Sequence, residues 1–112
     1  MIINNDKQNT SNKYIYIKES GIYIKLKLKD IMYLSSNARK VTIYTKEKLY
    51  SVYDRMIVFD KILSEFDFIR THQSYLINSL YIKCIGRNFI IMCDNSRIPI
   101  SRKYNNICKW QI

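Results

Sequence analysis

Strict alternation of apolar and polar residues dominates the first half of the chain. Residues 22–28, IYIKLKL, carry Ile or Leu at every second position, with Tyr or Lys between them. A period of two with one apolar and one charged face indicates an antiparallel strand buried on one side. Runs rich in Tyr, Ile, Leu and Val predict further strands, at 13–18, 31–34, 41–45 and 49–53. A turn is predicted at 19–21, between the strands at 13–18 and 22–28. A basic loop is predicted at 35–40, between the strands at 31–34 and 41–45.

The period changes after residue 53. Spacings of three and four residues separate Met56, Phe59, Leu63 and Phe66, which predicts an amphipathic helix over about residues 55–65. Asp54 stands just before this run and is a suitable N-cap. We expect the apolar face of this helix to be core, and we assign it no further function.

The last third returns to strand patterns. Strands are predicted at 82–86 and 89–93 around a turn at 86–88, and at 97–100, where Pro99 favours a strand end or sheet edge. Ser101 is a suitable cap for a short final helix over 102–110. The predicted fold is therefore mainly β, with one or two short helices.

Length and charge narrow the function. A chain of 112 residues suffices for one domain, and we expect a flexible tail or linker end at 1–12 before a domain at 13–112. The 19 Lys and Arg residues against 9 Asp and Glu give a net charge of +10. The positive electrostatic field of such a charge favours nucleic acid as the first partner and an anionic membrane surface as the second. With no secretory signal and no apolar run of ~20 residues, we expect a cytoplasmic protein without a membrane partner.

The inventory of reactive residues argues against an enzyme or a metal site. The cysteines, at 84, 93 and 108, have no close Cys-x-x-Cys spacing, and the single histidine, His72, is distant from them in sequence. The chain has no Gly-rich phosphate loop and no nucleophile motif with a matching base. We therefore expect no catalytic residues, no metal, no cofactor and no small-molecule substrate.

Polar residues concentrate in one apolar stretch. Residues 68–78, FIRTHQSYLIN, hold six hydrogen-bonding side chains among apolar neighbours. Such groups either satisfy one another and nearby backbone or face a polar ligand. A second polar group, Ser101-Arg102-Lys103, follows the predicted strand at 97–100, and its composition suits a phosphate.

Three motifs together resemble the LytTR family, the DNA-binding domains of bacterial LytR/AgrA-type response regulators. FIRTHQSYLIN at 68–78 resembles the central family signature, KDIMYLSS at 29–36 resembles an earlier segment, and IPISRKY at 98–104 resembles the terminal one. The order and spacing agree, and the resemblance covers about residues 13–110.

The resemblance implies a fold and a mode of binding. It implies an elongated antiparallel β fold of three small sheets with short helices. It also implies sequence-specific binding to double-stranded promoter DNA, as two copies on direct repeats, with loops entering successive major grooves. A receiver domain of a two-component system would belong to a parent protein, although a stand-alone LytTR protein is also consistent with the chain.

Three residues are predicted to read bases, and the resemblance suggests the loops that carry them. Arg102 matches the family's groove-entering arginine, and a guanidinium bonds guanine O6 and N7. Gln73 can read adenine, contact phosphate or cap its own loop, and these readings stay open. Arg39 is the candidate in the loop 37–40, where this chain departs from the family members that carry histidine.

The remaining candidate residues serve position rather than sequence. Those expected to contact phosphates are Lys40, Arg70, Ser74, Ser101, Lys103 and Tyr104. His72 and Asn78 are expected to support loops through hydrogen bonds, because buried polar groups are nearly always paired. The whole interpretation requires that the segments near 39, 73 and 102 lie on one side of the molecule.

Two alternatives use the ten tyrosines. The first is a single-stranded nucleic-acid module in which tyrosine rings stack on bases. The second is a protein–protein interaction through the Tyr-rich strands, with DNA contact incidental. Preference for unstructured single strands over duplex would support the first, and a stable protein complex without duplex binding would support the second.

Overall fold

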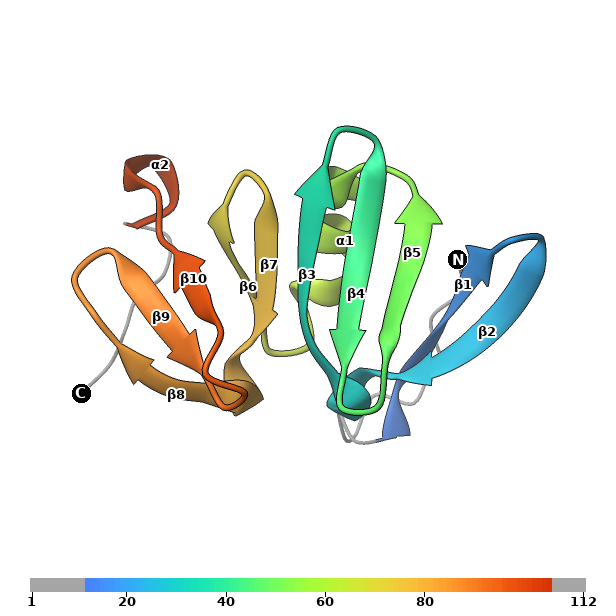
Figure 1. The fold of residues 1–112 in the computed structure, drawn as a ribbon, viewed down its shortest axis with the longest axis horizontal. Helices are drawn as coiled ribbons and strands as arrows, with labels where there is room; N and C mark the ends of the chain where they lie inside the picture. The colour runs from blue at the N-terminus through green and yellow to red at the C-terminus, as the bar shows by residue number, and fades with distance from the viewer. Residues whose placement is uncertain (1–11, 106–112) are drawn as a thin grey trace.

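The computed structural model describes residues 12–105, which form three antiparallel sheets with two α-helices (Figure 1). The largest sheet has five strands in the order β5-β4-β3-β7-β6. Their bounds are Ile31–Asn37 (β3), Lys40–Thr45 (β4), Leu49–Tyr53 (β5), Phe68–His72 (β6) and Tyr75–Asn78 (β7). Strand β3 therefore lies in the middle of the sheet and pairs with β4 on one side and β7 on the other.

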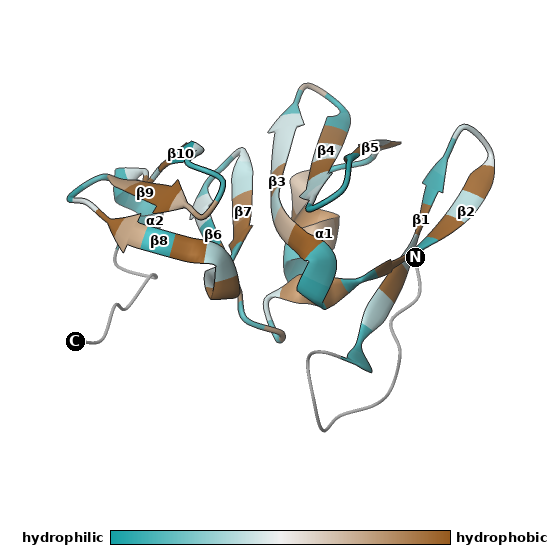
Figure 2. Cartoon of the chain, turned by 60° about the horizontal axis from the view of Figure 1, so that its bottom comes forward, coloured by the Kyte–Doolittle hydropathy of each residue, from teal (hydrophilic) through white to brown (hydrophobic). Residues whose placement is uncertain are grey.

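Two smaller sheets flank the central one. One is a hairpin of β1 (Tyr14–Glu19) and β2 (Ile22–Lys27), drawn in blue beside β5 in Figure 1. The other contains β8 (Ile82–Ile85), β9 (Phe89–Met92) and β10 (Arg97–Pro99), and it lies beyond β6 and β7. Bands of contrasting hydropathy along β1 and β2 in Figure 2 mark the alternation that favours half-buried strands.

The central sheet is covered on both faces. On one face, helix α1 (Met56–Leu63) and the β1–β2 hairpin enclose a core that includes Leu34, Leu76 and Phe59. On the other face, Tyr33 and Ile77 join the apolar residues of the β8–β10 sheet. Neighbouring residues of β3 and β7 thus enter different cores, as the two-residue period of a strand requires.

Tyr33 links the second core to the loop that precedes β10. Its ring stacks on that of Tyr44 with centroids 4.2 Å apart, and its hydroxyl donates a hydrogen bond of 3.0 Å to Ser96 Oγ. Burial raises the pKa of the Tyr33 phenol above its ordinary value, against a lowering by the bond to Ser96. The hydroxyl is therefore held in its neutral form at a sheet-to-sheet contact.

Strand β5 is the outermost strand of the central sheet, and the first hairpin reaches across to it. The backbone N–H of Ser51, in the middle of β5, donates a hydrogen bond of 2.7 Å to Glu19 Oε2. Glu19 ends β1, so this hydrogen bond joins the hairpin to a strand of a different sheet, in addition to the packing of both in the shared core.

The strand and helix predictions from the sequence are confirmed, with local corrections. Ile22, assigned to a buried face, is 64% exposed because the tip of the β1–β2 hairpin extends beyond the core. The loop predicted at 35–40 reduces to a two-residue turn, since β3 continues to Asn37 and β4 begins at Lys40. Arg55 rather than Asp54 is the N-cap of α1, and the Asp54 carboxylate accepts the N–H of Arg55.

Three further predictions concern the two ends of the chain. Helix α2 spans Arg102–Asn105, and the rest of the helix predicted over 102–110 lies outside the described residues. Residues 1–11 of the predicted tail and Cys108 lie outside them as well. The Ser101 hydroxyl does not cap α2 within the described segment, because its oxygen is buried without a hydrogen-bond partner there.

Candidate nucleic-acid interface

Three connections lie along one edge of the molecule, at the top of Figure 1. They are the β3–β4 turn at 38–39, the β6–β7 turn at 73–74, and the junction between β10 and α2. A hydrogen bond of 2.9 Å from the Ser36 N–H to the Ser74 carbonyl joins the first two. Another of 2.9 Å, from the Ser101 N–H to the Thr71 carbonyl, joins the third to β6. The segments near 39, 73 and 102 therefore lie on one side, as the sequence interpretation requires.

The β3–β4 turn presents two cations to solvent. Asn37 pairs with Lys40 across the hairpin, so Ala38 and Arg39 alone make the turn. Ala38 adopts a positive φ of 58°, which non-glycine residues do at some energetic cost. Arg39 and Lys40 are both exposed at this tip.

The β6–β7 turn is held from below by Arg70. Arg70 Nε donates to the His72 carbonyl at 2.9 Å, and Nη2 donates to the Gln73 carbonyl at 2.6 Å. Nη1 forms an ion pair of 2.9 Å with Asp60 Oδ2 on α1. On the other side of the turn, His72 Nδ1 accepts the N–H of Ser74 at 3.0 Å. These bonds fix the backbone of the turn and leave the Gln73 side chain exposed.

The contacts of Arg70 change its assignment. The sequence suggested a phosphate contact, but the side chain is only 10% exposed and its guanidinium is directed at two carbonyls and a carboxylate. A planar guanidinium suits such a fork of acceptors. We therefore assign Arg70 to positioning the turn that carries Gln73. The two partners lie ten residues apart on different elements, so no local signal in the sequence reveals the pair.

Replacing Arg70 by lysine tests this assignment. Lysine keeps the positive charge, but its three donors share one nitrogen and cannot reproduce the planar fork in which Nε, Nη1 and Nη2 each reach a different acceptor. We expect Arg70→Lys to lower affinity for a cognate duplex by about tenfold, because charge-assisted hydrogen bonds of the turn are lost. Binding titrations against the wild-type chain measure this change. Unchanged affinity would return Arg70 to the role of a simple phosphate-contacting charge.

Helix α2 carries the third set of side chains. Arg102 and Lys103 are exposed, and Tyr104 is half-buried. The Arg70 guanidinium lies 5.4 Å from the centroid of the Tyr104 ring, which ties α2 to β6. Lys103 Nζ lies 5.4 Å from the same ring. Arg102 is thus exposed on a short helix that contacts the neighbouring strand, whereas the enclosed hydroxyl of Ser101 faces the interior.

Asn78 supports the interface from inside the fold. Its side chain is fully buried, and its Nδ2 donates to the Ile31 carbonyl at 2.9 Å and to the Leu28 carbonyl at 3.4 Å. Its Oδ1 accepts the N–H of Leu80 at 3.0 Å. Asn78 therefore joins the end of β7 to the start of β3, the two strands that lead to the exposed turns.

One cation of this edge escaped the sequence analysis. Arg55 is exposed at the start of α1 and lines a surface hollow together with residues of both turns. The volume of this hollow is about 440 Å³. The residue belongs to no motif, and only the packing of α1 behind the sheet brings it between the turns.

Residues 12–105 also contain groups that bear on metal binding, thiol chemistry and membrane insertion. Between residues 12 and 105, no three His, Cys, Asp or Glu side chains come together as a metal site. Cys84 and Cys93 are free and exposed. Of the helices within the same range, none has the length and apolarity needed to cross a membrane.

The fold and this edge define a small β-rich module of the DNA-binding class, and comparison with known proteins gives its family. Residues 21–109 match the family described as "LytTr DNA-binding domain". The chain belongs to this family, and the resemblance noted in the sequence is confirmed. It is thus a DNA-binding domain of the LytTr type.

Curated relatives carry the name "Sensory transduction protein LytT". The protein of that name from Bacillus subtilis (strain 168) is 41% identical over 81 residues, covering 68% of this chain and 34% of the relative. The one from Bacillus cereus is 31% identical over 93 residues, covering 79% of this chain and 37% of the relative. The chain therefore spans about a third of the length of the curated relatives it matches.

A solved structure supports the fold. It is described as "LytTr DNA-binding domain of putative methyl-accepting/DNA response regulator from Bacillus cereus". The TM-score is 0.74 at 23% sequence identity, with 84% of this chain and 91% of that chain covered. The expected fold of three small antiparallel sheets with short helices is confirmed.

Proposed function

We propose that this chain is the DNA-binding part of a bacterial transcription regulator that recognises direct repeats in double-stranded promoter DNA. In this proposal the β3–β4 turn, the β6–β7 turn and the start of α2 enter successive major grooves. A second copy of the chain occupies the second repeat. The regulator acts in the cytoplasm, and a receiver domain belongs to the parent protein, of which residues 13–112 form the DNA-binding domain.

The observation that carries the proposal is the common edge of the three exposed segments. The molecule measures 39 Å along its longest axis, which is comparable to the ~34 Å between successive major grooves on one side of a duplex. The described cations at this edge include Arg39, Lys40, Arg102 and Lys103, and the Asp60 carboxylate behind it is paired with Arg70. A positive edge of this length suits a negatively charged duplex.

Each segment receives a role in base reading or in phosphate contact. Arg102, Gln73 and Arg39 read base edges, since guanidinium and amide groups match the acceptor and donor patterns of guanine and adenine. Lys40, Lys103, Ser74 and Tyr104 contact phosphates and set the register, while His72, Asn78 and Arg70 hold the segments in place. The buried hydroxyl of Ser101 favours a contact through its neighbours rather than through its own oxygen.

Selection of bound duplexes from a random pool, followed by footprinting, tests the proposal. We expect an enriched motif repeated in the same orientation, with protection in adjacent major grooves. Enrichment of a single uninterrupted site, or protection confined to one groove, would contradict the proposed arrangement.

The salt dependence of binding gives a separate prediction. Each phosphate neutralised by a lysine or arginine should contribute about −0.9 to the slope of log affinity against log salt concentration. Affinity for a cognate repeat should therefore fall steeply with salt in fluorescence-anisotropy titrations. A flat response would remove the electrostatic part of the proposal.

A second candidate function is binding of single-stranded nucleic acid. Tyr53 is 83% exposed, and with Tyr23 it lines a hollow of about 540 Å³ between β5 and the tip of the first hairpin. Exposed rings are the stacking platforms that single-strand binders use. Competition separates the two functions, because an unstructured oligonucleotide should displace duplex only if the rings form the main site.

A further inference from the structure

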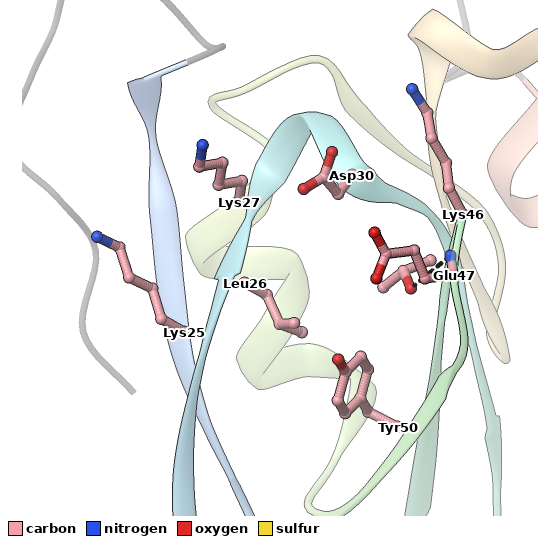
Figure 3. A pocket seen from close by; sticks show the side chains of 8 residues that line it. Lys25, Leu26, Lys27, Asp30, Lys46, Glu47 and Tyr50 are labelled. Carbon is pink, nitrogen blue, oxygen red and sulfur yellow. Dashed lines mark hydrogen bonds between the residues drawn. The ribbon is translucent and has the colours of Figure 1, made fainter.

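One of the surface hollows differs from the others in the charged residues that line it. The hollow between β2 and the β4–β5 turn has a volume of about 310 Å³, and its lysines alternate with the carboxylates of Asp30 and Glu47 (Figure 3). The hollow beside Tyr53 is lined by both a lysine, Lys18, and a carboxylate, Asp54. By contrast, the charged residues that line the hollow beside Arg55 are two arginines, without a carboxylate.

This arginine-lined hollow lies between two of the segments proposed to enter DNA grooves. Ser36 and Ala38 of the β3–β4 hairpin form one side, and Gln73 and Ser74 of the β6–β7 turn form the other. The start of α1, with Arg55, closes the third side. The bond from the Ser36 N–H to the Ser74 carbonyl holds the two turns at a fixed separation across it.

Hydrogen-bonding groups around the hollow are available to a ligand. Within the described residues, the Ser36 hydroxyl, the Ser74 hydroxyl and the Gln73 amide make no hydrogen bond. The Arg55 side chain is exposed, and the hydrogen bond to Asp54 uses its backbone N–H rather than its guanidinium. Arg70 is already paired with Asp60, so the exposed guanidinium at the hollow is that of Arg55. Hydroxyl, amide and guanidinium donors are the groups that bind a phosphodiester.

We propose that this hollow binds one backbone phosphate of the duplex, with Arg55 as its principal cation. The inference rests on the proposed function and adds a phosphate site to it. The two turns lie side by side on the edge proposed to face the duplex, so a DNA strand that crosses both of them brings a phosphate to the opening of the hollow. The site fixes the spacing of the two turns on the DNA and carries no base preference of its own.

Loss of the Arg55 guanidinium tests the site. Arg55→Ala should weaken binding to a cognate duplex by about tenfold, equally for related sequences, and should make the salt slope shallower by about one. Lys61→Ala is the matched control, because Lys61 is exposed on the same helix, outside the hollow, and carries the same charge. Its loss should leave the slope nearly unchanged. Thermal unfolding of both variants separates a lost contact from a lost fold.

Ethylation interference locates the phosphate. With the wild-type chain, ethylation of one phosphate within the protected region should block binding, and with Arg55→Ala that interference should disappear. The same affinity and slope for Arg55→Ala and Lys61→Ala, or an unchanged interference pattern, would overturn the inference while leaving the proposed function intact. Failure of the wild-type chain to bind any duplex would instead remove the proposed function.

Discussion

Replacing Arg102 by alanine is expected to cost about 1–3 kcal/mol of DNA-binding free energy and to relax the preference at one base pair. The residue is the first of α2 and is exposed at the edge where the two turns end. A guanidinium that donates two hydrogen bonds to guanine distinguishes that base from the other three. Alanine removes both bonds, so cognate and substituted sites should then bind with similar affinity.

The matched control is Lys103→Ala, because Lys103 is the next residue and is equally exposed. A lysine that contacts phosphate should weaken all sequences alike, without altering the ranking of substituted sites. Titrations of both variants against a set of single-base substitutions measure the difference. If Arg102→Ala reduced cognate and scrambled affinities by the same factor, its role in base reading would be lost.

The second large effect concerns stability. Asn78→Ala is expected to lower the free energy of unfolding by about 3 kcal/mol, because it removes three hydrogen bonds in the interior. The Ile31 carbonyl and the Leu80 N–H would lose the hydrogen bond that Asn78 supplies, and the Leu28 carbonyl would keep the N–H of Ile31. Buried polar groups without partners bear most of that cost.

Urea unfolding of the variant measures the change, and Asn88→Ala is a suitable control. Asn88 is exposed in the turn between β8 and β9, so its truncation should change the free energy of unfolding by less than about 0.5 kcal/mol. Equal midpoints for the two variants would contradict the central position that the structure gives to Asn78.

Local patterns revealed most of the fold. Alternation and helical spacing predicted the strands and α1, because these signals depend on neighbouring residues in the chain. They failed at Ile22, since alternation indicates which face a residue occupies but not whether the core extends that far along the strand. The capping prediction at Asp54 was one residue early for a similar reason, as only the backbone geometry shows where the helix begins.

The candidate site, like the fold, could be predicted from the sequence only in part. The motifs pointed to the segments around Arg39, Gln73 and Arg102, and the structure brings those segments to one edge. The part played by Arg70 could not be predicted, because its acidic partner lies on a helix packed behind the sheet. Arg55 was missed because nothing in its neighbourhood along the chain marks it, and only the packing of α1 brings it between the two turns.

The contact between Glu19 and Ser51 has a consequence for how these molecules coexist in solution. Outer strands expose unpaired backbone groups and can recruit a strand from another molecule, which leads to aggregation. The Glu19 carboxylate occupies the central N–H of β5 and places a negative charge where an incoming strand would dock. The same residue that fastens the hairpin thus discourages unwanted polymerisation along this flank.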